Sequence, residues 1–291
     1  MNKKIFVIIV TYNGSKWIEK CISSVLKSSY LVEIIMIDNN SNDDTVSIIK
    51  QFPQVHLIES QQNLGFGKAN NLGIDLALQK NADCIFLLNQ DTWIFEDTIS
   101  NLVIVAENNT SFGILSPMHL SGDGVNLDES FKVYYNRKLE ISENQNISIV
   151  SFVNAAAWLI PKSCLEKVGK FEPLFSHYGE DRNYCDRVLY HNFKIGIVEN
   201  AKICHDRKIV RNFKKDIVQS KYAILSKVLN INHTLLGSYF DGLKSVFGLP
   251  KYFLKNYGFL KIINLFFRLL FYYIALIISI PKIVKTRQSF K

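Results

Sequence analysis

The chain has 291 residues, of which 48% are hydrophobic, and a formal net charge of +8. This length and apolar content can bury a full core, which excludes a disordered chain and allows one large domain with an appendage. The charge is uneven: residues 1–207 carry 19 Lys and Arg against 24 Asp and Glu (−5), whereas residues 208–291 carry 15 against 2 (+13). Because the basic segment also has the longest apolar runs, it indicates a membrane surface as a partner and argues against nucleic acid.

Strand and helix signals alternate at short intervals through the first hundred residues. Continuous apolar runs predict strands covered on both faces, and apolar residues at helical spacing predict helices. The predicted strands are Lys4–Val10, Val32–Ile37, Val55–Ile58 and Cys84–Leu88, and the predicted helices are Gly14–Ser28, Asp43–Phe52 and Lys68–Gln79. Repeated units of this kind predict a parallel sheet with right-handed crossovers.

Beyond residue 110 the alternation becomes less regular. The polar residues 119–147, with a Gly122-Asp123-Gly124 turn signal, predict a loop-rich insertion. The other predicted elements are strands at Phe112–Ser116 and Ile149–Phe152, an apolar stretch at Ala155–Ile160, a helix at Glu180–His191 and a strand at Ala201–Cys204. The five cysteines form no CxxC pair, and no apolar signal peptide precedes the first strand. We therefore expect reduced thiols that fill the core of a cytosolic protein.

Three of the early strands are followed by polar residues. These clusters are Thr11-Tyr12-Asn13-Gly14, Asp38-Asn39-Asn40-Ser41 and Asn89-Gln90-Asp91-Thr92. In a parallel sheet they lie at one edge, where ligands of such sheets bind. The set suits a nucleotide: Tyr12 to stack on a base, Asp38 to accept a hydrogen bond, and Asp91 to hold Mg²⁺ or Mn²⁺ on a diphosphate. Turn chemistry explains any one cluster, but three at successive strand ends favour a site.

The segment NLGFGKANNLG at residues 63–73 is glycine-rich and opens a predicted helix. Such a loop lets the backbone approach a ligand. Its spacing matches neither a Walker loop nor a dinucleotide fingerprint, and no Lys-Ser or Lys-Thr pair follows it. The segment therefore argues against an NTPase.

Six motifs occur in the order seen in family 2 glycosyltransferases: VTYNG, IDNNSNDDT, NLGFGKANNLGI, LLNQDT, GKFEPLFSHYGEDRNYCDRV and AKICH. Over residues 4–207 the chain most resembles the bacterial rhamnosyltransferase-type enzymes of surface polysaccharide synthesis. The resemblance implies the α/β GT-A fold, with a mixed, largely parallel sheet flanked by helices. We expect residues 1–210 to form the glycosyltransferase domain and residues 211–291 a helical, basic, membrane-associating region.

The same resemblance implies the reaction. The chain would move a sugar, rhamnose or another hexose, with inversion from a nucleotide-diphospho-sugar to a hydroxyl of a glycan or lipid-linked acceptor. The residues that would bind the donor are Thr11, Tyr12, Asn13, Asp38, Asn40, Gly67, Asn70, Asn89, Gln90 and Asp91. Two alternatives stay open: a sugar nucleotidyltransferase, although Thr11–Gly14 lacks the Gly-rich basic loop of that class, and a non-catalytic subunit that binds a sugar nucleotide or glycan.

The resemblance also implies a divalent cation, Mg²⁺ or Mn²⁺, held by Asp91 and His205. Asp91 is the one acid left of the family's DxD-like element, because Gln90 stands where relatives often have Pro or Asp. His205 matches a family histidine near the metal or diphosphate, although a lone His is often structural. Basic side chains could instead meet the diphosphate: Arg207, Lys208 or Arg211.

Glu180 and Asp181 match the family's Glu-Asp pair at the start of the acceptor-side helix, with Asp181 in the position of the catalytic base. Single displacement needs one carboxylate that takes the proton of the acceptor hydroxyl, and it needs no nucleophilic carboxylate. The alternative is charge complementarity with the helix N-terminus, which favours acids there in any protein. Asn183 stands where many relatives have Asp, so an acceptor contact there would be neutral.

The segment Ile262–Ile280 is apolar apart from Arg268, and the uncharged run that follows Arg268 is shorter than the roughly twenty residues that span a bilayer. A polar stripe at helical spacing consists of Lys261, Asn264, Arg268, Tyr272, Ala275 and Ser279. We therefore expect a helix in the membrane interface, peripheral on the cytoplasmic face of a bacterial inner membrane. Anionic headgroups would meet Lys251, Lys255, Lys282, Lys285, Arg287 and Lys291. The alternative is a helix docked on the enzyme core or on a dimer partner.

Overall fold

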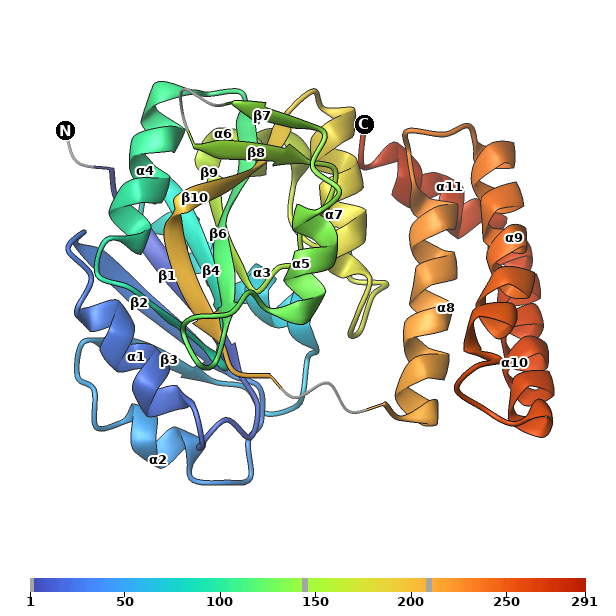
Figure 1. Cartoon of the computed structure of the whole chain (residues 1–291), viewed down its shortest axis with the longest axis horizontal. Coiled ribbons are helices and arrows are strands. Elements are labelled where there is room, and N and C mark those ends of the chain that lie inside the picture. The colour runs from blue at the N-terminus through green and yellow to red at the C-terminus, as the bar shows by residue number, and fades with distance from the viewer. Residues whose placement is uncertain (1–2, 143–145, 208–210) are drawn as a thin grey trace.

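The computed structural model describes residues 3–142, 146–207 and 211–291. A mixed sheet of ten strands within these residues forms the centre of the larger half of the molecule (Figure 1). The strands are β1 Ile5–Thr11, β2 Val32–Asp38, β3 Val55–Glu59, β4 Cys84–Asn89, β5 Thr92–Ile94, β6 Phe112–Ser121, β7 Glu140–Ser142, β8 Ile147–Val150, β9 Ala157–Pro161 and β10 Lys194–His205. Their order across the sheet is β3-β2-β1-β4-β9-β6-β10-β8-β7, and β5 pairs with β10.

The predicted parallel sheet is confirmed for the N-terminal half. β3, β2, β1 and β4 pair in parallel, as do β6 and β10, whereas β9, β8, β7 and β5 pair antiparallel with their neighbours. This mixture is the mixed, largely parallel sheet that the resemblance implied. The parallel strands bring the polar ends of β1, β2 and β4 to one edge.

Both faces of the sheet are covered, which explains why the central strands are continuous apolar runs. The helices of this half are α1 Ile18–Leu26, α2 Thr45–Ile49, α3 Phe66–Gln79, α4 Thr98–Asn108, α5 Glu129–Tyr135, α6 Lys162–Val168 and α7 Glu180–Tyr190. Alternate residues of β1 enter two separate cores: Val7 packs in the core with α1 and α4, and Ile8 packs in the core with α3, α6 and α7. All five cysteines are buried, as predicted for core residues.

The expectation of a loop-rich insertion at residues 119–147 is wrong for most of the described part of that segment. β6 continues to Ser121, and α5, β7 and the start of β8 follow. The polar residue Asp128 is the N-cap of α5 and accepts hydrogen bonds from the backbone N–H groups of Ser130 and Phe131. Turn-like polar residues thus precede a helix here, because the same side chains that favour turns also cap helices.

Four further helices lie beside α7, at the C-terminal side of the molecule (Figure 1). They are α8 Phe213–Leu229, α9 Leu235–Phe253, α10 Phe259–Ile278 and α11 Ile280–Gln288. They share a core of their own that also takes in Phe175 from the first half. The Ser226 hydroxyl donates to the Gly179 carbonyl (3.1 Å), and His191 Nε2 donates to the Phe290 carbonyl (2.8 Å). The helices are therefore docked on the sheet half by polar as well as apolar contacts.

Helix α10 has two apolar faces. One face is buried against the other C-terminal helices, through Ile262, Leu265, Leu269, Tyr273 and Leu276. The other face is exposed, through Phe259, Leu260, Phe267, Phe271 and Ile278. The alternative of a helix docked on the enzyme's own core therefore describes half of α10. In the described part of the chain, α10 is the one helix long and apolar enough to cross a membrane, judged by length and composition.

The expectation that Arg287 meets lipid headgroups is wrong. Its side chain is buried, and its guanidinium donates to the carbonyl groups of Val228 (2.9 Å), Asn230 (2.6 Å) and His233 (2.6 Å). A guanidinium that satisfies carbonyl groups beyond the end of a helix stabilises the turn that follows it. Arg287 therefore fixes α11 to the junction of α8 and α9.

Candidate active site

The polar clusters that follow β1, β2 and β4 meet at one edge of the sheet, as the sequence predicted. Thr11 is paired in register with Asp38, and Val10 with Asn89. Gln90 joins two of these strand ends, because its Oε1 accepts from the Thr11 hydroxyl (2.6 Å) and from the Tyr12 N–H (2.9 Å). Its Nε2 donates to the Tyr12 carbonyl (3.2 Å). Gln90 thus fixes the backbone on which Tyr12 is presented.

A cavity of about 560 Å³ opens at this edge. Its lining residues are Val10, Tyr12, Asn39, Asn63, Leu64, Gly65, Phe66, Asn89, Gln90, Asp91, Ser176 and His177. The Tyr12 side chain is 43% exposed, so its ring is available for stacking. We call this space the donor-side cavity.

Asp38 lies at the end of β2, next to the lining residue Asn39. Its Oδ2 accepts from the Ser41 N–H (3.0 Å). Its Oδ1 is buried and has no hydrogen-bond partner among the described residues. A buried carboxylate oxygen that accepts no hydrogen bond costs free energy. The unpaired Oδ1 therefore indicates that a bound ligand supplies the hydrogen-bond donor.

Of the ten predicted donor-binding residues, four line the donor-side cavity: Tyr12, Asn89, Gln90 and Asp91. Thr11 and Asp38 lie at the ends of β1 and β2 beside it, and the remaining four have other surroundings. Asn13 (φ 48°) and Asn40 (φ 69°) adopt the left-handed conformation that asparagine tolerates in turns. Gly67 lies in α3, where an added Cβ would be 3.2 Å from Cβ of Phe171. Asn70 donates to the Phe66 carbonyl within α3 (3.0 Å). These four residues therefore shape the backbone and the packing around the cavity.

Gly65 is a residue whose role the sequence did not single out. It has φ 78° and caps α3, and an added Cβ would lie 1.9 Å from the carbonyl oxygen of Ser176. Only glycine permits this approach of two backbone segments. It brings Ser176 and His177 to the wall of the cavity. Burial, assisted by the charge of Lys215, lowers the pKa of His177.

Asp91 and His205 face each other across the strand ends. Oδ1 of Asp91 lies 3.4 Å from Nε2 of His205, and the pairing of Thr92 with His205 between β5 and β10 holds them there. Oxygen and imidazole donors this close suit one divalent cation, provided that phosphate oxygens and water complete its coordination. No group of three or more His, Cys, Asp or Glu gathers among residues 3–142, 146–207 and 211–291. The pair thus fits a cation that arrives with a phosphate ligand.

The basic candidates beside this pair differ in their surroundings. Arg207 donates from Nη2 and Nε to the two carboxylate oxygens of Asp128 (2.6 and 3.0 Å). Burial raises the pKa of Asp128, but the hydrogen bonds from Arg207 and from the Phe131 N–H outweigh it and hold that pKa below its ordinary value. Arg211 lies 3.4 Å from Asp216, and Lys208 is outside the described residues. Arg207 therefore remains the basic candidate that borders the site.

A second cavity, of about 650 Å³, adjoins the first. Phe66, Asn89 and His177 line both cavities. The other residues around the second cavity are Tyr134, Phe152, Asn154, Ala155, Ala156, Tyr178, Gly179, Glu180, Asp181, Arg182, Arg207, Lys215, Gln219, Ala223, Ser226 and Lys227. We call it the acceptor-side cavity. Asp181 lies on its wall, and Asp91 lies on the wall of the adjoining donor-side cavity.

Glu180 and Asp181 are the first two residues of α7, which begins after Gly179 in a left-handed conformation. Burial, and secondarily the charge of Asp181, raises the pKa of Glu180 to about 7. Burial also raises the pKa of Asp181, against the hydrogen bond from the Arg182 N–H (2.7 Å) and the charge of Arg182. A raised pKa brings a carboxylate closer to the working pH, which suits a general base.

Asn183, which stands where many relatives have Asp, does not line the acceptor-side cavity formed by the described residues. Asn183 is fully buried, and its Oδ1 accepts from Nε of Arg187 (3.2 Å) one turn further along α7. Helical geometry explains this, because a residue two positions after Asp181 points to a different face. Asn183 therefore belongs to the packing between α7 and the sheet half.

The sequence did not predict that α8 forms a wall of the acceptor-side cavity. The wall consists of Lys215, Gln219, Ala223, Ser226 and Lys227, which recur at helical spacing. The Tyr222 hydroxyl of α8 also hydrogen-bonds the Ser176 hydroxyl of the donor-side cavity. The helical spacing of these residues was the sequence signal for this wall. The positive charge of the whole C-terminal segment favoured a membrane surface as the partner instead.

Comparisons with known proteins identify the family and the fold of the chain. The family described as Glycosyl transferase family 2 matches residues 6–166. A low-salt glycan biosynthesis hexosyltransferase of Haloferax volcanii is 25% identical over 214 residues, which cover 70% of this chain and 67% of that protein. A dTDP-rhamnosyl transferase of Shigella flexneri is 27% identical over 209 residues, which cover 70% of each. The solved structure of a Pyrobaculum calidifontis mannosyltransferase with GDP-Man and Mn²⁺ has a TM-score of 0.63 and 14% identity, over 90% of this chain and 78% of that one.

Proposed function

The chain belongs to glycosyl transferase family 2 and has the GT-A fold, and from this premise we propose a specific reaction. It transfers a hexose, with rhamnose as the first candidate, from a nucleotide-diphospho-sugar to a hydroxyl of a glycan or lipid-linked acceptor, and it inverts the anomeric carbon. The observation that carries the proposal is the adjoining pair of cavities, with Asp91 on the wall of one and Asp181 on the wall of the other. The rhamnosyl relative from Shigella supports the choice of sugar.

The donor lies in the donor-side cavity. The exposed ring of Tyr12 stacks on the base, and the unpartnered Oδ1 of Asp38 accepts from the nucleoside. Thr11 and Gln90 hold the backbone of Tyr12 in place, and Asn89 lies where the two cavities meet. In this proposal the diphosphate extends toward Asp91 and the sugar extends toward the acceptor-side cavity.

A divalent cation, Mg²⁺ or Mn²⁺, is proposed between Asp91 and His205. The 3.4 Å separation of their ligand atoms and the Mn²⁺ complex of the mannosyltransferase support this. When bound, the cation neutralises the charge that develops on the leaving diphosphate. Arg207 lies at the same border and adds positive charge next to the site, although Asp128 offsets part of it.

Asp181 is the proposed general base. As the acceptor oxygen attacks the anomeric carbon, the bond from that carbon to the diphosphate oxygen breaks and Asp181 takes the hydroxyl proton. Attack from the face opposite the leaving group inverts the centre in one step. Glu180, whose pKa is raised to about 7, is largely buried next to Asp181, and its Oε2 has no hydrogen-bond partner among the described residues. We assign it to the electrostatic setting of the base.

The C-terminal region, residues 211–291, is proposed to keep the enzyme peripheral on the cytoplasmic face of a bacterial membrane. The exposed apolar face of α10 and the +13 balance of residues 208–291 support this. A glycosyltransferase held there would meet a lipid-linked acceptor at the bilayer surface. The acceptor-side cavity, walled partly by α8, then opens between the sheet half and the membrane-associated helices.

The proposal is tested by incubating the purified full-length protein with a panel of nucleotide-diphospho-sugars and measuring release of the nucleoside diphosphate, with dTDP-rhamnose included. We expect one donor to be turned over faster than the rest when a cation and an acceptor glycolipid are present. Release of inorganic diphosphate from a sugar phosphate and a nucleoside triphosphate would instead identify a nucleotidyltransferase. Binding of a donor without transfer of its sugar to any acceptor tested would favour a non-catalytic binding subunit.

A further inference from the structure

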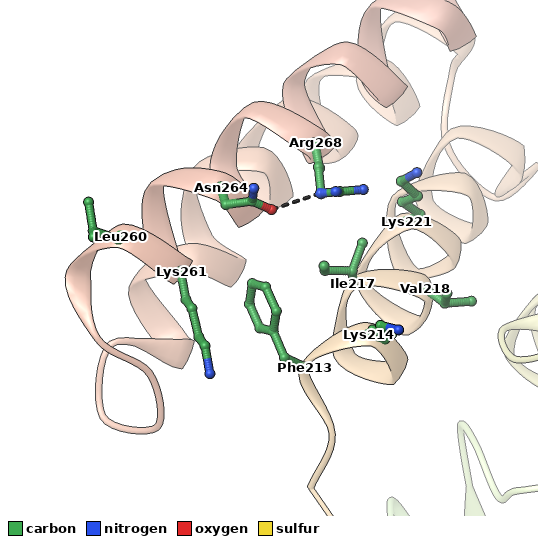
Figure 2. Close-up of a pocket in the computed structure, with 9 residues that line it drawn as sticks. All are labelled: Phe213, Lys214, Ile217, Val218, Lys221, Leu260, Lys261, Asn264 and Arg268. Atoms are coloured by element: carbon green, nitrogen blue, oxygen red, sulfur yellow. Dashed lines mark hydrogen bonds between the residues drawn. The ribbon is translucent and has the colours of Figure 1, made fainter.

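A groove between α8 and α10 is separate from both cavities of the active site. It has a volume of about 590 Å³. Figure 2 shows its lining residues, which come from the first turns of α8 and of α10: Phe213, Lys214, Ile217, Val218, Lys221, Leu260, Lys261, Asn264 and Arg268. Four of these residues are apolar (Phe213, Ile217, Val218 and Leu260), and every charged residue in this set is a cation.

Among the described residues, the four cations of the groove have no acidic partner. Lys214, Lys221, Lys261 and Arg268 form no ion pair with a carboxylate among the described residues. Arg268 uses only its Nε, which donates to Oδ1 of Asn264 (2.7 Å; Figure 2). The acid nearest in sequence, Asp216, is buried and already accepts from the Tyr257 hydroxyl (2.5 Å) and pairs with Arg211 (3.4 Å). The positive charge of the groove is therefore available to an external anion.

Two of these cations lie in the first turn of a helix, where the helix dipole is unfavourable for a positive charge. Lys214 is the second residue of α8, and Lys261 is the third residue of α10. The N-terminus of a helix carries a partial positive charge, so a cation in the first turn is unfavourable by roughly 0.3–1 kcal/mol. Charges that oppose their own helices at two neighbouring N-termini indicate a requirement other than folding, since such local conflicts occur at functional sites.

The apolar part of the groove is continuous with the exposed apolar face of α10. Leu260 lines the groove and is 81% exposed, and Phe259 beside it is 73% exposed. Across the groove, Phe213 extends from α8 toward α10, and Val218 is partly exposed (Figure 2). A ligand that places its charge among the lysines can thus continue along apolar side chains without leaving the surface.

We propose that this groove binds one anionic membrane lipid, with its headgroup at the cations that line the groove (Lys214, Lys221, Lys261 and Arg268) and the start of its hydrocarbon chain on Phe213, Val218 and Leu260. The inference rests on the membrane association proposed above and makes it specific. Charge complementarity supports the phosphate, because the four described cations face no acid. A soluble phosphate would satisfy the cations but would leave the apolar walls in water, so a lipid fits the whole groove.

The groove and the acceptor-side cavity lie on different faces of α8. Lys214, Ile217, Val218 and Lys221 face the groove, whereas Lys215, Gln219, Ala223 and Lys227 face the cavity. A lipid bound on one face therefore holds the bilayer surface about one helix diameter, roughly 10–12 Å, from the acceptor-side cavity. That position brings the headgroup of a lipid-linked acceptor within reach of Asp181 without inserting the catalytic half into the membrane.

The test compares binding of full-length variants to phosphatidylglycerol vesicles and to phosphatidylcholine vesicles by co-sedimentation. The groove variant carries Lys214→Gln, Lys221→Gln, Lys261→Gln and Arg268→Gln. The matched control carries Lys251→Gln, Lys255→Gln, Lys282→Gln and Lys285→Gln, which removes the same charge from exposed positions. Diffuse attraction to the surface would weaken both variants equally. We expect the groove variant to bind phosphatidylglycerol vesicles at least about 10-fold more weakly than the control, and equal losses would overturn the proposal.

A second pair of variants tests the apolar wall. Val218→Glu puts an acid into the groove, and Ile104→Glu puts one at an exposed position on α4. We expect Val218→Glu alone to weaken binding to phosphatidylglycerol vesicles about 10-fold, with unchanged thermal unfolding; equal effects would count against the groove. Release of the wild type by millimolar inorganic phosphate would identify a plain anion site and refute the lipid assignment.

The same experiments separate failure of the groove from failure of the wider proposal. Wild-type protein that ignores phosphatidylglycerol vesicles refutes the membrane association together with the groove. Wild type that binds vesicles while the groove variant matches its control refutes the groove alone. Turnover of the nucleotide sugar with a soluble acceptor, measured on every variant, should stay unchanged, because no substituted residue lines the donor-side or acceptor-side cavity.

Discussion

The carboxylate of Asp91 faces the imidazole of His205, with 3.4 Å between Oδ1 and Nε2. The two residues are distant in sequence, and the short strand β5 brings them together by pairing antiparallel with the end of β10. The N–H of Asp206 also donates to the Asp91 carbonyl (2.9 Å), which fixes the backbone on both sides of the pair. The geometry therefore links the proposed cation site to the pairing of two strands at the sheet edge.

We predict that Asp91→Asn removes the effect of Mn²⁺ on donor affinity, by at least about 10-fold in the dissociation constant, because a neutral amide oxygen binds divalent cations poorly. Calorimetric titration of the donor with Mn²⁺ and with excess chelator measures this. Asp44→Asn, which removes an acid at an exposed position, is the control and should behave as wild type. Full activity of the wild type in excess chelator would exclude a metal from the mechanism.

We predict that Asp38→Asn weakens nucleotide binding but has little effect on the free energy of unfolding. Its Oδ1 is buried and unpartnered, whereas its Oδ2 is engaged by the Ser41 N–H. In Asp38→Asn the remaining oxygen can keep the bond to Ser41, so the free energy of unfolding should stay within about 1 kcal/mol of wild type. Nucleoside diphosphate affinity should fall about 10-fold, because a charged acceptor is lost. Chemical denaturation and nucleotide titration measure the two quantities, and unchanged nucleotide affinity would remove Asp38 from the donor site.

Gly65 should be intolerant of a side chain. In Gly65→Ala the new methyl group would lie 1.9 Å from the Ser176 carbonyl oxygen, at a backbone with φ 78°. We expect a loss of at least about 2 kcal/mol in unfolding free energy and weaker donor binding, since Ser176 and His177 must move away from the cavity. The matched control is Gly248→Ala in α9, where an added Cβ would meet no described side chain or other segment within 4 Å and helix propensity should raise stability by up to about 1 kcal/mol. Equal stability of the two variants would contradict this account.

The sequence predicts the features of the fold that depend on neighbouring residues better than the features that depend on contacts between residues distant in sequence. The strand ends that carry Thr11, Asp38 and Asn89 were predictable, because an uninterrupted apolar run indicates a buried parallel strand and its polar end indicates the sheet edge. Helix α5 was missed, since Asp128 serves a turn and a helix N-cap equally well. Local propensity therefore gave the order of most elements and misjudged the segment where the same residues serve two structures.

The site was predictable only where a motif is local. Glu180 and Asp181 are adjacent in sequence and came from the family resemblance. Gly65 depends on a contact with Ser176, which no local pattern encodes. The role of α8 as a cavity wall was not predicted. Lys215 and Lys227 belong to a segment whose overall positive charge indicated a membrane surface instead. The burial of Arg287 could not be predicted either, because carbonyl groups of a distant turn satisfy it.

The raised pKa of Glu180 predicts a particular dependence of stability on pH. Burial raises this pKa from 4.5 to about 7, so between these values the folded state binds a proton that the unfolded state has released. The contribution of Glu180 to the free energy of unfolding is therefore fully present below about pH 4.5. It falls by up to about 3 kcal/mol as the pH rises through about 7. Glu180→Gln should lack this loss. Urea denaturation at several pH values tests it, and parallel curves for wild type and variant would show that Glu180 has an ordinary pKa.

Asp181 is the residue on which the proposed chemistry depends most. It lines the acceptor-side cavity, burial raises its pKa, and its Oδ1 accepts from the Arg182 N–H. Asp181→Asn keeps the shape and one acceptor oxygen but cannot take the proton of the attacking hydroxyl. General-base catalysis contributes about 10² to 10⁴ in rate, so kcat should fall by that factor while donor affinity stays nearly unchanged.

Asp186→Asn is the matched control for this variant. Asp186 lies on the same helix and also has a raised pKa, about 6, mainly through burial, but it is not among the described residues that line the acceptor-side cavity. If Asp181 is the base, the two variants differ by orders of magnitude in kcat although each loses one acid from α7. Folding of Asp181→Asn should survive, because the change removes a charge–dipole interaction of about 0.3–1 kcal/mol at the helix start. Wild-type turnover by Asp181→Asn, or loss of activity through unfolding alone, would make Asp181 a helix-terminal charge and would exclude it as the base.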